Sequence, residues 1–357
     1  MAATSPGFAI LLTASIMFHV LTSSDLDRLI ADTEGEMERV IESAQDERTA
    51  ELYGWIRYHL GLDSDAPRGK RLRPLLGLLA YQSIAGEHQR ALPGAAAVEM
   101  GHNFSLVHDD IQDNSPERRH RAALWTITGV PQAINTGDTL FTLSRLALHR
   151  LEDLGFPPRT VLDLMRLYDE TCLALCEGQY LDIAASQGGS PMSVEGYLDM
   201  IGRKTAALIA GSVQAGAMLA TDDARVIEAY RSFGWALGMA FQINDDLLGI
   251  WGEEHDTGKL ASDLAEHKRT LPLLHALEHA AGTDRERLLE LTTRSTITDE
   301  DATAARDIME RAGSRAFTRG RAAAWRDEAL TQLTASGIVD GEAMVRLESI
   351  VRSVIAA

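Results

Sequence analysis

Carboxylates and guanidiniums are concentrated in one short segment, SLVHDDIQDNSPERRHR (residues 105–121). Asp109 and Asp113 are four residues apart, which on a helix places both carboxylates on one face, one turn and about 6 Å apart. Two carboxylates at that distance repel each other unless a cation lies between them, and oxygen ligands with open positions suit Mg²⁺. For this motif alone, a solvated acidic helix end is the alternative interpretation.

A second aspartate pair, Asp245 and Asp246, lies within the strongly apolar segment FQINDDLLGIW (241–251). Charged side chains in such a run are costly unless they are paired or bound to a metal. A structural role is the alternative for this pair taken alone. Together, two aspartate clusters on apolar helices indicate facing helices that grip one polyanion through metal ions.

Cationic residues accompany the aspartates. The segment RGKRLRP (68–74) contains four of them, Arg118 and Arg119 follow the first aspartate cluster, and Lys204 precedes an apolar run. Arginine contacts phosphate through two parallel hydrogen bonds, and lysine acts as a point charge. Any one of these groups could be solvated surface, but each adjoins an acidic or apolar helix end. The sequence therefore predicts a substrate with a diphosphate at one end and a hydrocarbon body at the other.

The segments that must position these groups are predominantly helical in pattern. Strand-like runs with a period of two are scarce, and the abundant Ala, Leu, Glu and Arg favour helix. We expect an all-α fold, a single large helical bundle around a central cavity. The segment LIAGSVQAGAMLA (208–220) is apolar around its whole circumference, which predicts a position in the middle of that bundle.

Composition narrows the remaining possibilities. The 357-residue chain has a formal net charge of −18, which makes nonspecific binding to nucleic acid unfavourable. Residues 8–21 are apolar but too few to span a bilayer. We therefore expect no stable membrane anchor, and we treat residues 1–23 as an extension of unclear role before a single domain at 24–357. The two cysteines, Cys172 and Cys176, indicate unpaired thiols in a reducing, cytoplasmic compartment.

Several motifs in order resemble one family. These motifs are GKRLRP (69–74), HNFSLVHDDIQD (102–113), EGQYLDI (177–183), FQINDD (241–246) and DLAEHKRTLP (263–272). Their order and spacing are similar to those of the trans-isoprenyl diphosphate synthases, the polyprenyl synthetase family. The resemblance implies an all-α fold, Mg²⁺ dependence and a homodimer. It also implies a prenyltransferase that condenses isopentenyl diphosphate with an allylic diphosphate.

The resemblance also implies a role for each matching residue. The residues that would bind Mg²⁺ on the allylic diphosphate are Asp109 and Asp113, supported by Asp110, while Asp245 would hold another Mg²⁺, helped by Asp246. The cations that would neutralise this diphosphate are Arg118, Lys204 and Lys259, and the residues that would line its reacting end are Thr205 and Gln242. The residues that would hold isopentenyl diphosphate are Lys70, Arg73, His102 and Arg119.

Product length has one marker in the sequence. Phe104 precedes Asp109 by five residues, and in the family bulky side chains near this position form the floor of the cavity. The pattern resembles that of the short-chain enzymes, so geranylgeranyl diphosphate is our first expectation and farnesyl diphosphate the second. The second motif ends in Gly249, where the family often has another aspartate. This change weakens the expected metal site but leaves Asp245.

Two other interpretations remain open. A class I terpene cyclase shares metal-triggered ionisation, but it binds one diphosphate and would give Lys70, Arg73 and His102 no purpose. A non-catalytic regulatory subunit would be expected to lose its aspartates, whereas the first aspartate motif is intact here.

Overall fold

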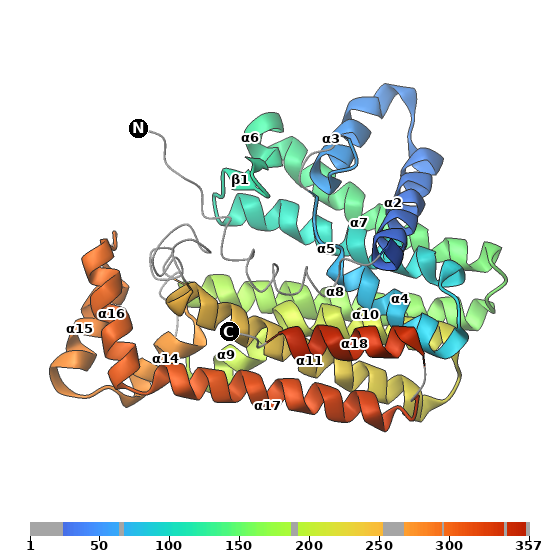
Figure 1. The fold of residues 1–357 in the computed structure, drawn as a ribbon. Coiled ribbons are helices and arrows are strands. Elements are labelled where there is room, and N and C mark those ends of the chain that lie inside the picture. Colours follow the sequence, from blue (N-terminus) through green and yellow to red (C-terminus); the bar gives the residue numbers. More distant parts are fainter. Residues whose placement is uncertain are drawn as a thin grey trace.

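The computed structural model describes residues 24–63, 68–186, 192–252, 268–294, 296–338 and 341–354. Helices account for almost all regular structure in these ranges (Figure 1), which confirms the predicted all-α class. One short antiparallel hairpin is present, formed by β1 (Glu117–Arg118) and β2 (Arg121–Ala122). The predicted N-terminal extension, residues 1–23, lies outside the described residues.

The helices of the first half of the chain carry Asp109 and Asp110 of the first aspartate cluster, together with Arg73 and His102. They are α2 (Ser24–Ala44), α3 (Ala50–Leu60), α4 (Leu72–Ala85), α5 (Leu92–Gln112), α6 (Leu124–Thr128), α7 (Val130–Asp153) and α8 (Pro158–Ser186), with the short 3₁₀ turns η1 (Glu47–Thr49) and η2 (Gln89–Ala91). Helices α2 and α3 are separate because the Asp46 side chain accepts a hydrogen bond from the Arg48 N–H and caps η1 between them.

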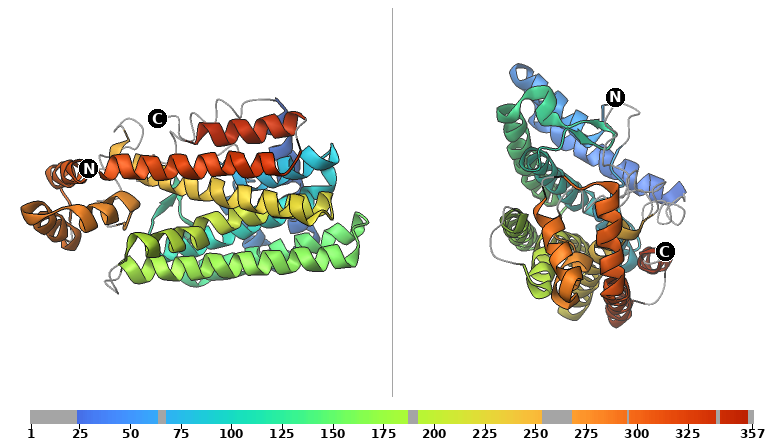
Figure 2. Two further views of the ribbon diagram at one scale, coloured as in Figure 1. Left: turned by 90° about the horizontal axis from the view of Figure 1, so that it is seen from below. Right: turned by 90° about the vertical axis from the view of Figure 1, so that its left-hand side faces the viewer.

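The second half of the chain carries the second aspartate pair. Its elements are α9 (Val194–Ile201), the five-residue π-helix η3 (Gly202–Ala206), α10 (Ala207–Ala220), α11 (Ala224–Trp251), α14 (Leu271–His279), α15 (Gly282–Thr293), α16 (Asp299–Arg311), α17 (Ser314–Ala335) and α18 (Glu342–Ser353). Helix α17 runs alongside α11 over most of its length (Figures 1 and 2).

The apolar helix α10 lies in the interior, as its sequence predicts. It packs against α4, α8 and α11, and residues such as Leu208, Val213 and Ala217 are buried on different sides of it. Helices α4 and α10 approach at backbone distance, because a Cβ built on Gly216 would lie 2.1 Å from the Gly77 carbonyl oxygen. Any larger residue at 216 would therefore separate the two helices.

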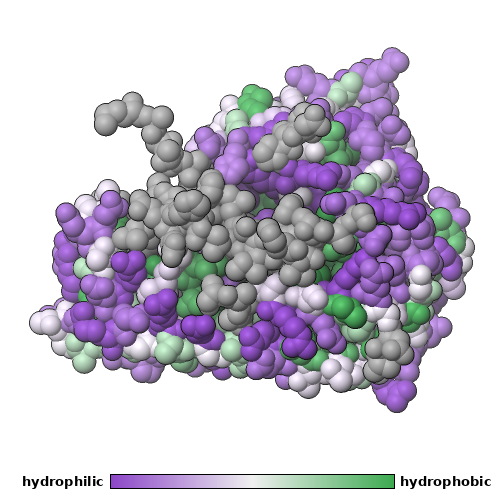
Figure 3. All heavy atoms as spheres, in the orientation of Figure 1, coloured by the Kyte–Doolittle hydropathy of each residue, from purple (hydrophilic) through white to green (hydrophobic). Residues whose placement is uncertain are grey.

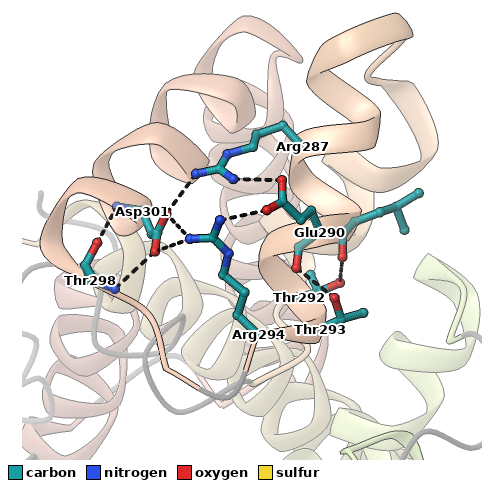
Figure 4. Close-up of polar contacts among 8 residues, drawn as sticks. Arg287, Glu290, Thr292, Thr293, Arg294, Thr298 and Asp301 are labelled. Carbon is teal, nitrogen blue, oxygen red and sulfur yellow. Dashed lines mark hydrogen bonds and ion pairs between the residues drawn. The ribbon is translucent and has the colours of Figure 1, made fainter.

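Helices α15 and α16 project from one end of the bundle (Figure 1) and share a small apolar core with α14 and the end of α11. A polar network joins the two helices (Figure 4): Arg287 and Arg294 both donate to the carboxylate of Asp301 at 2.8 Å. Asp301 also completes a capping box with Thr298 at the start of α16. These contacts stabilise the α15–α16 pair as a unit.

The face shown in Figure 3 is mainly hydrophilic, with hydrophobic residues scattered among polar ones. Such scattering is usual for a protein surface in water. Each helix in the described ranges is too short or too polar to cross a membrane.

Candidate active site

The first aspartate cluster lies where α5 ends. Asp109 and Asp110 are in its last turn, and Asp113 is the C-cap residue, whose N–H donates to the Asp109 carbonyl at 2.8 Å. Negative side chains at a helix C-terminus are unfavourable toward the helix dipole, so the helix itself gains nothing from them. Arg118 in the following hairpin donates from Nε to Asp110 Oδ1 at 2.7 Å. Among the described residues, no hydrogen bond reaches the carboxylates of Asp109 or Asp113.

Burial raises the pKa of all three carboxyl groups. The pKa of Asp109 is raised to about 6, mainly by burial, with Lys204 opposing the shift and Asp113 adding to it. Burial is also the main cause of the raised pKa values of Asp110 and Asp113. Because negative charge is unfavourable here, these groups gain more than ordinary carboxylates from a neighbouring cation.

The two aspartates of the second motif point in different directions. Asp246 is 3% exposed and its carboxylate is held within the protein by the Tyr197 hydroxyl, by the Leu271 N–H at 2.9 Å and by Gln242 Nε2 at 3.4 Å. Asp245 is partly exposed, and its charge opposes the lowering of the pKa values of Lys70 and Arg73 by burial. Asp245 therefore faces the site, while Asp246 fixes the surrounding helices.

The π-helix η3 positions Lys204 and Thr205. Lys204 Nζ donates to Asp182 Oδ2 at 2.5 Å, and Thr205 Oγ1 donates to Gln242 Oε1 at 2.9 Å. Lys204 also lowers the pKa of Asp109 by its charge, so it lies between α8 and the first aspartate cluster. Single π turns occur often at functional sites, where they redirect side chains.

A cationic cluster lies at the start of α4 and across from it on α5. Arg73 Nη1 and His102 Nε2 are 3.0 Å apart. Burial, together with the charges of Arg73 and Arg119, holds the pKa of His102 well below its usual range, so the imidazole is neutral and accepts from Arg73. Burial lowers the pKa of Lys70 to about 8, with Asp245 opposing the shift. Three of the predicted substrate-binding residues, Arg73, His102 and Arg119, are thus within electrostatic range of one another, and Lys70 shares the influence of Asp245 with Arg73.

Two nitrogen atoms of this cluster are buried without a partner among the described residues, Arg73 Nε and Arg119 Nη1. A buried donor that makes no hydrogen bond loses its hydration without compensation. Burial lowers the pKa of both guanidiniums, that of Arg119 to about 10. The cluster therefore has unused capacity for an anion with several acceptor oxygens.

Arg71, the third cation of the 68–74 segment, has a different role. Its side chain is buried and donates to Glu99 Oε1 at 2.8 Å, to Glu34 Oε1 at 3.1 Å and to the Leu60 carbonyl at 2.5 Å. Its backbone has a φ of 53°, a conformation that non-glycine residues adopt only when the surroundings compensate for it. Arg71 therefore anchors the segment from inside, so that Lys70 and Arg73 face the site.

Phe104 lies one turn and a half before Asp109 on α5 and is 8% exposed. Its ring contacts Phe141 edge to face, with centroids 5.0 Å apart, and Phe141 stacks on Tyr168 at 6.4 Å. The Tyr168 hydroxyl is 2.5 Å from Ser144 Oγ. The three rings form a layer of aromatic side chains across α5, α7 and α8.

An apolar pocket lies beyond this layer, on the side away from the aspartates. It is lined by Tyr168 together with Gly94, Val98, Leu148, Leu164 and Leu208. Val98 and Gly94 are eleven and fifteen residues before Asp109, which corresponds to about 16 and 22 Å along the helix axis. The aromatic layer therefore separates the polar site from this pocket.

The structure places Lys204 and Arg118 beside Asp109 and Asp113, and it places Asp245 beside Lys70 and Arg73. Lys259 lies outside the described residues. Sequence reasoning overlooked Asp182 and Asn103, which bond directly to Lys204 and Arg119, and Glu99, which holds Asn103. Glu99 could have been found as a lone charge in an apolar helix, where a buried partner is required.

Comparison with known proteins supplies independent evidence. A family model described as polyprenyl synthetase matches residues 60–309. A geranylgeranyl diphosphate synthase of Mycobacterium tuberculosis is 38% identical over 289 residues, covering 78% of this chain and 80% of the relative. A (2E,6E)-farnesyl diphosphate synthase of the same organism is 34% identical over 295 residues, 80% of each chain. The crystal structure of geranylgeranyl pyrophosphate synthetase from Pyrococcus horikoshii has a TM-score of 0.84 at 29% identity, covering 96% of this chain and 99% of that one.

Proposed function

The chain belongs to the polyprenyl synthetase family, and from that premise we propose that it condenses isopentenyl diphosphate with an allylic diphosphate to give geranylgeranyl diphosphate. The product is a short all-trans prenyl diphosphate, and farnesyl diphosphate is the second candidate. Enzymes named for each of these two products are among the relatives.

The observation that supports this proposal is the presence of two separate polar regions, each of which suits one diphosphate. One consists of Lys70, Arg73, His102 and Arg119, with two buried guanidinium nitrogens available for an anion. The other consists of Lys204 beside Asp109 and Asp113, where a cation is needed before a diphosphate can bind. Two diphosphates fit the condensation, whereas a terpene cyclase would use only one.

The acidic region fits Mg²⁺. The donors are hard carboxylate oxygens, and in the described ranges no three Asp, Glu, His or Cys side chains lie close enough to hold a metal by themselves. Mg²⁺ suits such a site because it binds one or two carboxylates and completes its shell with waters and substrate phosphates. We assign Asp109 and Asp113 on one side and Asp245 on the other as its ligands. When bound, Mg²⁺ stabilises the negative charge of a departing diphosphate.

The protein's own residues contribute to each stage of the proposed reaction. Lys204 and Arg118, with Lys259, would neutralise the allylic diphosphate as its C–O bond ionises. Thr205 and Gln242, joined by their hydrogen bond, would line the reacting end. The alkene of isopentenyl diphosphate then attacks the allylic cation, forming a C–C bond, and the proton lost from the adduct passes to the released diphosphate. The apolar walls exclude water that would otherwise capture the cation.

The aromatic layer would set product length. A prenyl chain that grows from Asp109 along α5 meets Phe104 first and Tyr168 next, before it reaches the apolar pocket. Phe104 is therefore the first barrier in this proposal and Tyr168 the second. The tyrosine is well fixed for this role, because its hydroxyl bonds to Ser144 and would lie 2.2 Å from a Cβ built on Gly101.

We also propose that the protein is a cytoplasmic homodimer whose single catalytic domain spans residues 24–357. Large apolar side chains are exposed on the adjacent helices α7 and α8, among them Leu173 at 60% and Tyr180 at 71%. Helix α8 lies at the outer edge of the bundle in Figure 2. Burial of such side chains against a second copy would stabilise a dimer. Sedimentation of the wild-type protein and of a Leu173→Glu variant tests this assignment, since the variant should sediment as a monomer.

Incubation with Mg²⁺ and farnesyl diphosphate, with and without isopentenyl diphosphate, tests the proposed activity. We expect a C20 diphosphate only when both substrates are present. A hydrocarbon formed from the allylic substrate alone would instead indicate a cyclase. The absence of any product with dimethylallyl, geranyl or farnesyl diphosphate would support a regulatory subunit.

A further inference from the structure

Arg119, the second arginine of the hairpin, is the proposed isopentenyl diphosphate ligand whose backbone lies in a tight turn. Arg119 lies in the two-residue turn between β1 and β2 with a φ of 52°, and its neighbour His120 also has a positive φ. The turn carries its backbone, yet its guanidinium must reach across to the cluster at α4 and α5. A long side chain on such a turn would sample many rotamers unless other residues fixed it.

The backbone of Gly69 supplies one side of the site where this guanidinium lies. A Cβ built on Gly69 would lie 2.7 Å from Arg119 Nη2 and 2.8 Å from Cζ, both closer than nonbonded atoms can approach. Gly69 is absent from the positive-φ glycines of the described chain, so its backbone conformation does not require glycine. The space that Arg119 occupies is the physical reason for a residue without a side chain at this position.

Asn103 supplies the other side. Its Oδ1 accepts a hydrogen bond from Arg119 Nη2 at 3.4 Å, and its amide nitrogen donates to the Glu99 carbonyl at 2.8 Å and to Glu99 Oε1 at 3.0 Å. These two donations orient the amide so that its oxygen faces Arg119. Glu99 is in turn held by the buried Arg71. A chain of contacts therefore runs from the core of α5 to Nη2, while Nη1 makes no hydrogen bond among the described residues.

We propose that Gly69 and Asn103 form a seat that positions the Arg119 guanidinium for isopentenyl diphosphate. Both are positioning residues, because they act on the substrate only through Arg119. This inference rests on the proposed function, in which Arg119 binds isopentenyl diphosphate. It explains why a glycine at position 69 and an asparagine at position 103 matter, although neither residue takes part in the reaction itself.

The substitution Gly69→Ala tests the seat with little risk to folding. The atoms that the new methyl group meets are at the end of a flexible side chain, so the guanidinium can move while the backbone stays in place. We expect the KM for isopentenyl diphosphate to rise about tenfold, because a ligand displaced by roughly 1 Å loses much of its contribution. The kcat, the KM for the allylic diphosphate and the melting temperature should each change less than about twofold or 2 °C. Gly54→Ala is the matched control, since nothing lies within 4 Å of a Cβ at that position.

The same substitution in an Arg119→Lys background separates positioning from a general effect on the loop. Lysine keeps the charge but lacks the planar fork that meets the methyl group, so Gly69→Ala should change the KM less than about twofold there. An equal rise in both backgrounds would overturn the seat, as would an unchanged KM in Gly69→Ala alone. If Arg119→Lys by itself leaves the KM for isopentenyl diphosphate unchanged, the proposed role of Arg119 fails, which is a separate result.

Asn103→Ala provides a second route to the same conclusion. It should raise the KM for isopentenyl diphosphate in the wild-type background and add little to Arg119→Lys. Its effect on the melting temperature reports the loss of its contact with Glu99 independently. Additive effects of Asn103→Ala and Arg119→Lys on the KM would exclude Asn103 from the seat.

Discussion

The cationic cluster, made of Lys70, Arg73, His102 and Arg119, and the first aspartate cluster meet along α5, which carries His102, Asp109 and Asp110, but their side chains are held differently. In the cationic cluster, Arg73 bonds to His102 and Arg119 bonds to Asn103. In the aspartate cluster, burial raises the pKa of both Asp109 and Asp113, the charge of Asp113 adds to the shift of Asp109, and neither carboxylate accepts a hydrogen bond among the described residues. The side chains of the cationic cluster are therefore held in place before any ligand binds. The carboxylates of the aspartate cluster are unfavourably placed as anions until a cation binds beside them.

This difference predicts that the two diphosphate substrates differ in their need for a metal ion. A diphosphate that meets a preorganised set of donors needs no metal and pays little for ordering side chains. A diphosphate that meets carboxylates is repelled until a divalent cation reverses the local charge.

The substitution Asp109→Ala should have the largest effect. It removes one proposed metal ligand, so we expect kcat to fall about 10³-fold or more. The fold should survive, because the wild-type carboxylate is buried at an energetic cost and has no hydrogen bond to lose among the described residues. Steady-state kinetics and thermal unfolding measure the two effects separately. Asp222→Ala, at an exposed position before α11, is the control, and near-normal turnover of Asp109→Ala would remove the metal role.

Removal of Mg²⁺ should have the next largest effect, because it should weaken the binding of one substrate much more than that of the other. With a chelator present, the affinity for geranyl diphosphate should fall about 100-fold, because the charge that reverses the repulsion is lost. The affinity for isopentenyl diphosphate should change little, since its proposed site consists of side chains already in place. Isothermal titration of each diphosphate, with and without Mg²⁺, measures both affinities. Equal losses for the two substrates would contradict the comparison.

The residues of both regions could be named from the sequence because each region depends on residue types at short spacing. The helical spacing of Asp109 and Asp113 and the apolar surroundings of Asp245 needed no tertiary information. The supporting contacts were not predictable, because they join segments far apart in sequence. Asp246 is an example: it resembles its neighbour in the sequence, but contacts from α9 and α14 turn it into the interior.

The same limit applies to the fold. The uniform apolar circumference of residues 208–220 predicted their central position, since no other environment in water buries all sides of a helix. The π-helix at Lys204 was not predicted, and neither was the close packing of η3 against α8. A Cβ built on Gly178 would lie 2.4 Å from the Lys204 backbone nitrogen, and this approach is invisible in a single sequence.

The pH dependence of the cationic cluster gives a third, smaller effect. Burial lowers the pKa of Lys70 from 10.5 to about 8, so the side chain loses its charge as the pH rises through 8. The kcat/KM for isopentenyl diphosphate, which reports the free enzyme, should therefore fall about tenfold between pH 7 and pH 9.5, the value of one charge-assisted hydrogen bond. Lys70→Arg should abolish this fall, because arginine stays protonated.

Linkage gives an independent check on Lys70 through stability. The folded state has the lower pKa, so between pH 8 and 10.5 the unfolded chain binds more protons. The contribution of Lys70 to stability should then increase as the pH rises through that window. The difference in unfolding free energy between wild type and Lys70→Met across this range isolates the contribution. A difference that stays constant from pH 7 to pH 10.5 would show that the lysine is not buried as described.

The smallest expected effect is on product length. It tests whether the apolar end of the site is as rigidly arranged as the cationic cluster. Phe104→Ala should lengthen the main product by one or two isoprene units, because the first barrier is removed while Tyr168 still closes the pocket. Phe104→Ala with Tyr168→Ala should give longer products still, since the chain can then enter the space beside Val98 and Gly94. Phe156→Ala is the matched control: it removes another buried phenylalanine at a similar cost of about 3–5 kcal/mol but should leave the product unchanged. Chromatography of the dephosphorylated products measures the lengths. A shift in the control, or none in the double variant, would mean that general loosening or another wall sets the length.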